Sequence, residues 1–480
     1  MAEGSRGNQI VSSSYPSSSS AYSSSSSSSC RDSSSITQMS HDQIISILQL
    51  LPIESVLSFS MTCRKFRSLG CSDALWESIC RREWGRGPVD TTLGTLSSES
   101  RGLSWKRLYQ QVAQLSSLSY TRLSSREGIF PKPRGSHSLN FVSDCLVLYG
   151  GGCDGGRHLD DTWVAYVGQG VKNAVHWKQV NSGQPSGRFG HTCIVISDAL
   201  VLFGGINDNG VRHSDTWIGR LSCDMSSEIK LAWKLLDVEH TLPPPRGAHA
   251  SCSFGEEKMI IHGGIGPGGL RLSDMWMLDL SNGFKSGRWH QIVTPQPSPA
   301  ARSGHSLTWA GESSMVLFGG RGTGYEALND IWVLDMEGDG PEWVQIACER
   351  PGSVPRGLPL PRVGHSATLV LGGKVLIYGG EDSQRRRKND FWLLDLKTLL
   401  ALRRRLQNTS LKRVAKKMWK RLKAEGMQQD RRSFHAACAD QSGRRLFIFG
   451  GMVDGIVHPA EACGLRFDGG LFLVELVLQL

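Results

Sequence analysis

The feature that most constrains this chain is a pattern that recurs six times between residue 133 and the carboxyl terminus. Each copy has an arginine three residues before a histidine, followed by an apolar run that ends in Gly-Gly. Five copies continue into an Asp-x-Trp run, and the sixth ends in LFLVEL at 471. The histidines lie 54 to 70 residues apart, at 137, 191, 249, 305, 365 and 435. A repeat of this length predicts an array of similar β units.

Each unit has room for four short strands. In five units a second tryptophan opens a further apolar run, at 177, 233, 289, 343 and 419. Four apolar strands per unit are typical of one blade of a β-propeller. The double glycine permits backbone conformations and close packing that a side chain would block. The predicted repeats lie near 133–180, 187–236, 245–292, 301–346, 361–422 and 431–480.

The last unit lacks its fourth strand, because only eight residues follow Phe472 and none is tryptophan. The missing strand is predicted upstream. Tyr120 lies 17 residues before His137, and the fourth-strand tryptophans lie 14 to 22 residues before the next motif histidine. We therefore expect residues 119–123 to pair with the last unit and close the ring, which removes open sheet edges.

These motifs resemble kelch repeats. The resemblance implies an all-β six-bladed kelch propeller over residues 118–480. It also implies that partners bind the face formed by the loops after each Gly-Gly together with the segments before each Arg-x-x-His. Those loops are 153–160, 206–214, 265–273, 321–329, 381–389 and 452–466.

Residues 36–84 have a helical pattern instead. Ser40 and Gln43 form a predicted capping box at the start of the first helix. Apolar residues at 44, 47, 48 and 51 recur at helical spacing and predict one apolar face. Pro52 suits the first turn of a second helix. The sequences CRKFRSL and ALW predict two more short helices, the last capped by Ser72 and Asp73.

In this order, the sequences ILQLLP, VL, CRKFRSL and ALW resemble an F-box, the helical module that docks on a Skp-type adaptor in Skp/cullin/F-box ubiquitin ligases. Met39-Ser40 stands where the family usually has Leu-Pro, and Phe66 where it often has Trp. The alternative is a generic helical hairpin packed on the next domain. The resemblance implies a small all-α F-box domain that binds the adaptor through Met39, Ile44, Ile47, Leu48, Leu51, Pro52, Leu57, Cys63, Phe66 and Trp76.

Residues 85–117 are expected to form a linker with a helical segment, SWKRLYQQV. An F-box followed by kelch repeats is similar to plant ubiquitin-ligase receptors of the ZEITLUPE type. Those receptors carry a flavin-binding LOV domain in front, for which the polar residues ahead of this F-box leave no room. A light-sensing role is therefore not expected.

Residues 11–35 contain 17 serines and almost no large apolar side chains. Such a segment cannot bury enough surface to offset the entropy of ordering, so residues 1–35 are predicted to be a disordered Ser-rich tail. No apolar stretch reaches the roughly 18 residues of a membrane span, and the N-terminus has no apolar signal-peptide core. The 12 cysteines contain no C-x-x-C. These features predict a nuclear or cytoplasmic protein with reduced thiols and no membrane contact.

The net charge is concentrated in one segment. The chain has 54 Lys and Arg against 44 Asp and Glu, a net +10. Residues 403–432 contain 12 basic residues against Glu425 and Asp430, so the basic pI does not by itself indicate nucleic-acid binding. Three interpretations of this segment stay open: a nuclear-import signal, an RNA or membrane contact, or a solvated flap. A spacing of four predicts a basic amphipathic helix, which competes with a strand for Trp419; its residues are Leu402, Leu406, Val414, Met418 and Leu422.

Each motif arginine of the first five repeats has an aspartate ahead of the later tryptophan, as Arg134 has Asp161. This predicts buried pairs that hold strands together. Gly470 stands at the aspartate position of the sixth repeat, so Arg432 is expected to be free to face solvent or a ligand. The motif histidines, one per unit, are expected to be structural and to lie around the ring instead of in one metal cluster.

The loop 381–389 reads EDSQRRRKN. Guanidinium groups bind carboxylate and phosphate bidentately. We therefore expect Asp382, Arg385, Arg386 and Arg387, with Arg432, to recognise an acidic or phosphorylated substrate, although a merely solvated loop is the alternative.

The sequence thus predicts a non-catalytic substrate receptor that binds a Skp-type adaptor, through it a cullin, and an unidentified protein substrate. A kelch scaffold without ligase function is one alternative. A metal-dependent kelch enzyme is the other, because iron-dependent specifier proteins use a Glu-x3-Asp-x3-His triad. Asp454 and His458 fit part of that spacing, but Gly450 occupies the Glu position. No Ser/His/Asp elbow or phosphate-binding P-loop appears, and no cofactor or metal is expected.

Overall fold

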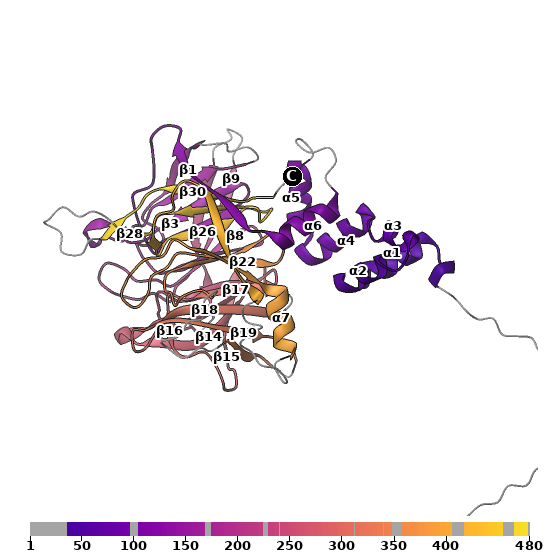
Figure 1. Cartoon of the computed structure of the whole chain (residues 1–480). Coiled ribbons are helices and arrows are strands. Elements are labelled where there is room, and N and C mark those ends of the chain that lie inside the picture. Colours follow the sequence, from indigo (N-terminus) through magenta and orange to yellow (C-terminus); the bar gives the residue numbers. More distant parts are fainter. Residues whose placement is uncertain are drawn as a thin grey trace, which may run out of the picture. The chain divides into compact units, whose positions relative to one another are not determined.

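The structure is a computed structural model that divides into two compact units, residues 1–70 and 71–480. Each unit is described by itself (Figure 1). The predicted tail, residues 1–35, lies outside the described residues. The described residues are 36–96, 104–168, 174–223, 229–239, 241–311, 313–338, 340–347, 358–405, 417–454 and 465–478.

The first unit is helical, as its apolar spacing predicts. Ser40 caps the first helix: its hydroxyl accepts from the Gln43 amide at 3.2 Å, and the Gln43 side chain accepts from the Ser40 amide at 3.0 Å. This is the predicted capping box. Ile44, Leu48 and Val56 are buried. The elements are η1 (Ile36–Gln38), α1 (His41–Leu50), α2 (Ile53–Ser60) and α3 (Arg64–Leu69).

The second unit begins with α4 (Asp73–Trp84), α5 (Arg86–Leu96) and α6 (Trp105–Gln114). Tyr109 of α6 holds α4: its ring stacks on Trp84 with centroids 5.6 Å apart, and its hydroxyl donates to Glu83 at 2.8 Å. On its other side α6 buries Leu108 and Val112 in an apolar cluster of the β-sheets. The linker helix therefore connects α4 firmly to the sheets.

Four sheets of the second unit follow the repeat pattern. The first contains β2 (Ser138–Val142), β3 (Cys145–Tyr149), β4 (Thr162–Tyr166) and β6 (Trp177–Asn181). The second contains β7 (Thr192–Ile196), β8 (Ala199–Phe203), β9 (Thr216–Cys223) and β10 (Ile229–Leu235). The third contains β11 (Asp237–Val238), β12 (Ala250–Phe254), β13 (Lys258–Ile265), β14 (Arg271–Asp279) and β15 (Ser286–Ile292). The fourth contains β16 (Arg302–Ser303), β17 (Ser306–Gly311), β18 (Ser314–Gly322), β19 (Ala327–Asp335) and β20 (Glu342–Ala347).

The fifth and sixth repeats share one larger sheet, because β24 pairs antiparallel with β23 and parallel with β1. The order in this sheet is β21 (Ser366–Val370), β22 (Lys374–Tyr378), β23 (Phe391–Asp395), β24 (Trp419–Gly426), β1 (Ser117–Ser125), β30 (Leu471–Leu476), β27 (Arg445–Phe449) and β26 (Ala436–Ala439), with β5 (Ala174–Val175) paired to the end of β1. The remaining elements are the small sheet of β25 (Arg432–Ser433), β28 (Met452–Asp454) and β29 (Leu465–Phe467), the turns η2 (Asp154–Gly156) and η3 (Pro267–Gly269), and α7 (Leu396–Arg405).

The strand ahead of the first repeat lies in the last one. β1 pairs antiparallel with β30, and Tyr120 stands opposite Val474. The Tyr120 ring is 1% exposed and stacks on Phe472 with centroids 5.1 Å apart. Residues 119–123 therefore occupy the closing position that the tryptophan-to-histidine spacing indicates.

A closed circle of backbone hydrogen bonds joins the six repeats at their inner ends. Each amide in the circle donates to the carbonyl of the corresponding residue in the preceding repeat, over 2.6 to 2.9 Å, and the first repeat donates to the sixth. All of these residues have φ between 53° and 66°. The circle runs through the residue before each motif histidine: Ser136, Gly190, Ala248, Gly304, Gly364 and Phe434. The repeats are thus arranged as a ring.

The basic segment 403–432 begins within a helix and ends in a strand. In α7, Leu396 and Leu399 are buried in a cluster with Trp419, the first residue of β24. Residues 406–416 lie outside the described part of the chain. The predicted amphipathic helix is therefore wrong at Trp419 and Leu422, which pair with β23 because the fourth-strand position takes precedence over the spacing of four.

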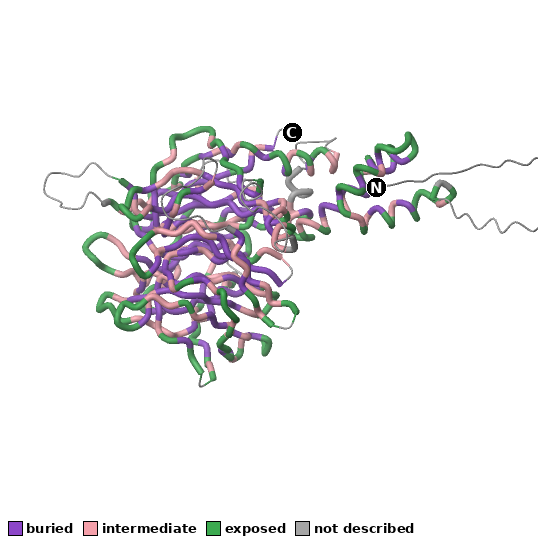
Figure 2. Tube along the Cα trace, turned by 60° about the horizontal axis from the view of Figure 1, so that its bottom comes forward, coloured by how far each residue is buried: buried purple, intermediate pink, exposed green. Residues whose placement is uncertain are grey.

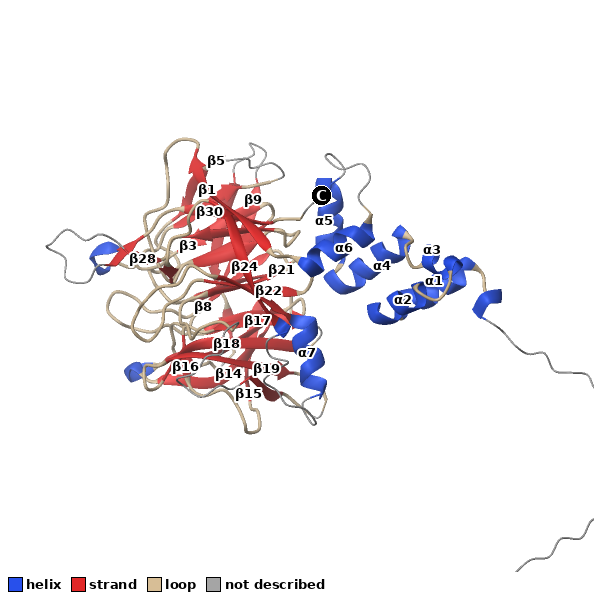
Figure 3. Cartoon of the chain, in the orientation of Figure 1, coloured by secondary structure: helices blue, strands red, loops and turns tan. Residues whose placement is uncertain are grey.

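The two ends of the sheets differ. Figure 3 shows α6 and α7 at one end and the short strands β16 and β28 at the other. Buried residues follow the strands between these ends, whereas exposed residues gather in the turns and loops (Figure 2). The loops that follow each Gly-Gly therefore lie at the end away from α6 and α7.

Tyr120→Ala tests the closure of the ring. Removing a buried aromatic ring leaves a cavity, so we expect the free energy of unfolding to fall by about 3 kcal/mol or more. Urea titration followed by tryptophan fluorescence measures this change. Thr121→Ala, at the exposed next position of β1, is the matched control and should leave stability unchanged. Equal small effects for both variants would contradict the observed closure.

Candidate functional site

In each repeat, one buried arginine bonds residues at both ends of the loop that follows Gly-Gly. Arg134 donates to both carboxylate oxygens of Asp161, at 2.6 and 2.9 Å, and to the Gly150 carbonyl at 3.0 Å. The predicted pairing is confirmed in all five repeats that contain the aspartate. The other four pairs are Arg188 with Asp215, Arg246 with Asp274, Arg302 with Asp330, and Arg362 with Asp390. A double hydrogen bond of this kind fixes the base of each loop.

The arginines favour the ionised form of Asp161, Asp215 and Asp274. Burial raises the pKa of Asp161, but the hydrogen bonds and charge of Arg134 outweigh burial, so that the pKa lies below its ordinary value. The pKa values of Asp215 and Asp274 are lowered in the same way by Arg188 and Arg246.

The expectation that Arg432 faces solvent or a ligand is wrong. Its side chain is fully buried and donates to Asp468 at 3.0 Å and to the Gly450 carbonyl at 2.7 Å. A buried guanidinium requires a carboxylate. Asp468 supplies it, two residues before Gly470, which occupies the position where the other five repeats have aspartate. Arg432 therefore holds the sixth loop and is not at the surface.

The motif histidines connect neighbouring repeats. In four of the six, Nε2 bonds a hydroxyl in the residue after the preceding motif histidine: His191 with Ser138, His249 with Thr192, His365 with Ser306, and His435 with Ser366, over 2.8 to 3.1 Å. Ala250 stands at that position ahead of His305, which bonds His262 instead at 3.0 Å. Ala436 stands there ahead of His137, whose Nε2 has no such hydroxyl partner among the described residues.

Burial keeps the six motif histidines and His262 neutral. It lowers the pKa of His191, His262 and His365 to about 3. It also lowers the pKa of the other four, His137, His249, His305 and His435, well below the ordinary value. Within the described residues, no group of three His, Cys, Asp or Glu side chains is placed to hold a metal ion.

Each loop forms a short ladder of backbone bridges. In the second repeat Ile206 bridges Phe189 on one side and Arg212 on the other, and in the fifth Glu381 bridges Val363 and Arg387. We call the described residues of these loops the loop face: 152–158, 206–213, 265–271, 321–327, 381–388, 452–454 and 465–467. It lies at the end of the sheets away from α6 and α7 (Figure 3).

Side chains tie neighbouring loops of this face together. Arg321 donates to Glu381 at 3.1 Å, which also accepts from Ser433 at 2.9 Å. Arg387 donates to Ser433 at 3.1 Å and to Asp454 at 2.9 Å. The fourth, fifth and sixth repeats therefore share one hydrogen-bond network.

The four residues of the fifth loop that were predicted to bind substrate differ in how far they are exposed. The Arg387 side chain is 3% exposed and belongs to the network above, so it supports the loop and is not at the surface. Arg386 is 72% exposed and donates to Asp382 at 2.9 Å, and Arg385 is exposed. Only Asp382, Arg385 and Arg386 are accessible to a partner.

The sequence reasoning considered only charged residues of these loops and therefore missed the exposed apolar residues of the loop face. Val211, Leu270 and Tyr325 are 53%, 71% and 68% exposed, at the tips of three consecutive loops. The guanidinium of Arg271 lies 4.4 Å from the centre of the Tyr325 ring. An apolar residue next to a turn of glycines, as in GPGGL and GTGY, was the available signal.

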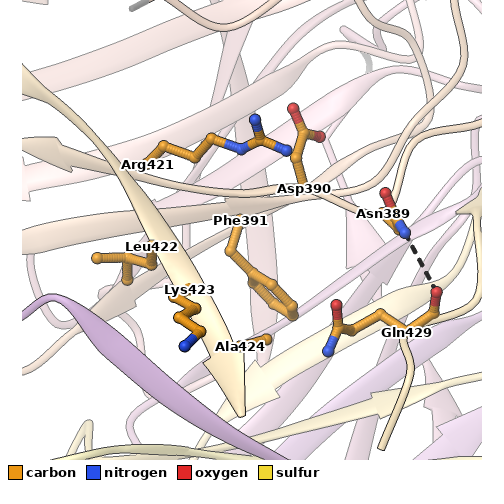
Figure 4. Close-up of a pocket in the computed structure, with 8 residues that line it drawn as sticks. All are labelled: Asn389, Asp390, Phe391, Arg421, Leu422, Lys423, Ala424 and Gln429. Carbon is orange, nitrogen blue, oxygen red and sulfur yellow. Dashed lines mark hydrogen bonds between the residues drawn. The ribbon is translucent and has the colours of Figure 1, made fainter.

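A cavity of about 410 Å³ opens where β24 leaves one partner strand for the other (Figure 4). The pairing with β23 ends at Phe391 opposite Leu422, and the pairing with β1 starts at Lys423. Arg421 and Lys423 make its wall basic, whereas Asp390 is held by Arg362. The remaining lining residues are Asn389, Ala424 and Gln429.

The ten residues predicted to bind an adaptor divide by burial. Ile44, Leu48, Phe66 and Trp76 are buried and hold the helices in place. Ile47, Pro52, Leu57 and Cys63 are exposed, and Met39 and Leu51 are half-buried. Two residues that the sequence reasoning missed, Leu50 and Met61, are 83% and 79% exposed on or beside α1 and α2.

Family models match both parts of the chain. The F-box-like model matches residues 41–82, and that of the KLHDC2/KLHL20/DRC7 Kelch-repeats domain matches residues 106–283, 223–358 and 353–457. An F-box/kelch-repeat protein of Arabidopsis thaliana is 53% identical over 458 residues, 93% of this chain and 94% of that protein. The chain belongs to the F-box/kelch-repeat family. The predicted F-box and kelch repeats are thereby confirmed.

More distant relatives of this F-box/kelch-repeat protein are longer. Adagio protein 3 of Arabidopsis thaliana is 30% identical over 373 residues, 76% of this chain and 56% of that protein. Adagio-like protein 1 of Oryza sativa subsp. japonica is 29% identical over 376 residues, and the chain covers 57% of it. The solved protein YjhT overlays on 71% of this chain with a TM-score of 0.48 and 14% identity. In the described part of the chain, no helix has the length and apolar composition that crossing a membrane requires.

The buried histidines predict acid sensitivity. Their folded pKa values lie below the unfolded value of about 6.5, so the unfolded chain binds protons first as the pH falls. Each should lower the free energy of unfolding by about 1.4 kcal/mol per pH unit below 6.5. Denaturant titrations at pH 7.5 and 5.5 measure the loss. His191→Asn should take up one proton fewer on unfolding, and stability that does not change with pH would contradict neutral buried rings.

Ala436→Ser should stabilise the protein. The new hydroxyl stands where Ser138 stands in the first repeat and would give His137 the kind of partner that four other motif histidines have. We expect a gain of about 1 kcal/mol in the free energy of unfolding. Ala250→Ser is the matched control, because His305 already bonds His262 there. Equal effects of the two serines would refute this account of the histidine contacts.

Proposed function

We propose that this protein is the substrate-recognition subunit of a Skp/cullin/F-box ubiquitin ligase. The observation that supports this most is the order of its parts: an F-box-like match at residues 41–82 is followed directly by kelch repeats. The F-box binds a Skp-type adaptor and through it a cullin. The propeller holds a target protein, which raises the effective concentration of the target near the ubiquitin-conjugating enzyme. The subunit itself is non-catalytic and acts in the nucleus or the cytoplasm.

The exposed apolar side chains of the first unit are the proposed adaptor contact. Ile47 and Leu50 on α1, and Leu57 and Met61 on or beside α2, are 38% to 83% exposed. Four large apolar side chains left in water on two short helices are typical of a surface that a partner covers. The buried residues Ile44 and Leu48 support this surface from inside.

The loop face is the proposed substrate contact. Six blades are part of this proposal, and the circle of backbone hydrogen bonds, which has one member from each repeat and closes after the sixth, supports that number. Variable loops on such a rigid ring are where binding specificity usually lies. Arg385 and Arg386 are exposed there and favour an acidic or phosphorylated target, whereas the Asp382 carboxylate accepts hydrogen bonds that shape the turn. Within the second unit, α6 leads to α4 from the opposite end of the sheets, so a bound target leaves that end free.

Adaptor binding tests the ligase proposal. The intact protein should co-purify with a co-expressed Skp-type adaptor, and Leu50→Asp with Leu57→Asp should reduce the recovery about tenfold or more, since each change places a charge at an exposed apolar contact. Ser55→Asp, an exposed position of α2 turned away from the buried side of that helix, is the matched control. Circular dichroism should show that all variants stay folded.

One result would count against this function, and another against the proposed contact surface. If the intact protein recovers no adaptor, the propeller is a binding module without a ligase partner. If the double variant binds the adaptor as well as Ser55→Asp does, the contact surface lies elsewhere on the helices.

A further inference from the structure

The loop face divides into two arcs of different chemistry. The apolar arc is Val211, Leu270 and Tyr325, at the loop tips of the second, third and fourth repeats. The basic arc is Arg385, Arg386, Arg466 and Arg157, which are exposed on the loops of the fifth, sixth and first repeats. Each arc therefore covers three consecutive repeats of the ring.

The apolar arc is held in shape before any partner arrives. Asn207 accepts hydrogen bonds from the amides of Asn209 and Val211 at 3.1 and 3.0 Å, which closes the turn that presents Val211. The one-turn helix η3 precedes Leu270. Tyr325 is steadied by the Arg271 guanidinium 4.4 Å from its ring centre. A single exposed apolar residue is ordinary, but three at the tips of adjacent, ordered loops are typical of a contact surface, where preorganisation lowers the cost of binding.

The basic arc is also built by a specific turn. Asp382 accepts from the amides of Gln384 and Arg386, both at 3.0 Å, and this turn places Arg385 at a φ of 59°. That conformation favours glycine and is unfavourable for an arginine. The loop thus gives up stability to project two adjacent guanidinium groups into solvent. Asp382 is shared by Arg386 and Lys388, at 2.9 and 3.6 Å, so one carboxylate does not neutralise the loop.

Arg157 completes the basic arc across the sixth repeat. It is exposed in the loop of the first repeat, which also contains the exposed Asp154. Arg466 lies between the two ends of the arc, on β29. Deeper in the face, Arg387 is compensated by Asp454 at 2.9 Å, so the exposed arginines above it are the cations available to a ligand.

We propose that the loop face binds a two-part segment of the target protein, with aromatic or aliphatic side chains on the apolar arc and acidic or phosphorylated residues on the basic arc. This rests on the proposed function, because it takes the propeller as the substrate-binding part. The apolar contacts supply desolvated anchors, as aromatic and aliphatic groups do at protein interfaces. The arginines supply charge-assisted hydrogen bonds to carboxylate or phosphate and fix the direction in which the segment lies.

The test uses the full chain, immobilised and presented with a phage library of random 16-residue peptides. Peptides that combine aromatic or aliphatic residues with at least two acidic residues should be enriched. The selected peptides are then synthesised with Asp and Glu unchanged, or replaced by phosphoserine or by serine. Serine replacement should weaken binding, and comparison of the other two distinguishes a carboxylate partner from a phosphate partner.

Two double variants at exposed residues distinguish the contributions of the two arcs to binding. Leu270→Ser with Tyr325→Ser should weaken binding of the selected peptides about tenfold and leave the salt dependence of binding as it is. Arg385→Ser with Arg386→Ser should weaken binding about tenfold and reduce that salt dependence, because screened charges are lost. Tyr166→Ser and Lys234→Ser are the matched controls: both residues are exposed and lie outside the loop face. Thermal melting checks that each variant is folded.

Several results would overturn the proposal: no enriched peptide, enrichment of purely apolar, purely acidic or basic peptides, or arc variants that bind as the controls do. The ligase proposal fails separately. If adaptor binding is lost while peptide binding depends on both arcs, the segment specificity stands without a ligase. If adaptor binding is intact and the arcs make no difference, only the two-part segment is refuted.

Discussion

The rest of the propeller depends on one contact, the buried pairing of an arginine with an aspartate in every repeat. A guanidinium that is 0% or 1% exposed is tolerated only where a carboxylate and further acceptors surround it. Here the acceptors are the aspartate and a glycine carbonyl at the end of the second strand, as in Arg188 with Asp215 and Gly204. The pairing therefore fixes where each loop starts and ends, whatever residues lie between.

The four residues from arginine to histidine make contacts within their own repeat and contacts that join it to the preceding repeat. The arginine bonds within its own repeat, the third residue donates a backbone hydrogen bond to the preceding repeat, and in four repeats the histidine bonds a hydroxyl of that preceding repeat. Such close approach requires the glycine pair. A Cβ on Gly151, at φ 100°, would lie 2.7 Å from the Cβ of His137. The circle thus closes through short, repeated contacts and not through one large interface.

Contacts that repeat could be predicted from the sequence, and contacts made once could not. Tyr120 was found because the distance to His137 matches a spacing that recurs in the other repeats. Asp468 was missed because the sixth loop offers its carboxylate two residues ahead of the position that the pattern indicates, and only burial of Arg432 requires it. Trp419 was ambiguous because a helical spacing and a strand position coincide there, and pairing with Leu394 decides between them. The exposure of Leu270 depends on how the preceding glycine turn folds, and the spacing of residues in the sequence does not predict that.

The same division separates the residues whose substitution should disturb the ring from those whose substitution should not. Residues of the arginine clamp are buried and paired, so a change in one leaves a charge without its partner. Residues at the loop tips, such as Val211 and Arg385, contact water on most sides and can change without loss of the ring. α6 meets the sheets at the other end, through Leu108 and Val112. Within the second unit, the loop tips thus lie at the opposite end of the sheets from the connection that α6 makes to α4, so a change at a loop tip does not touch that connection.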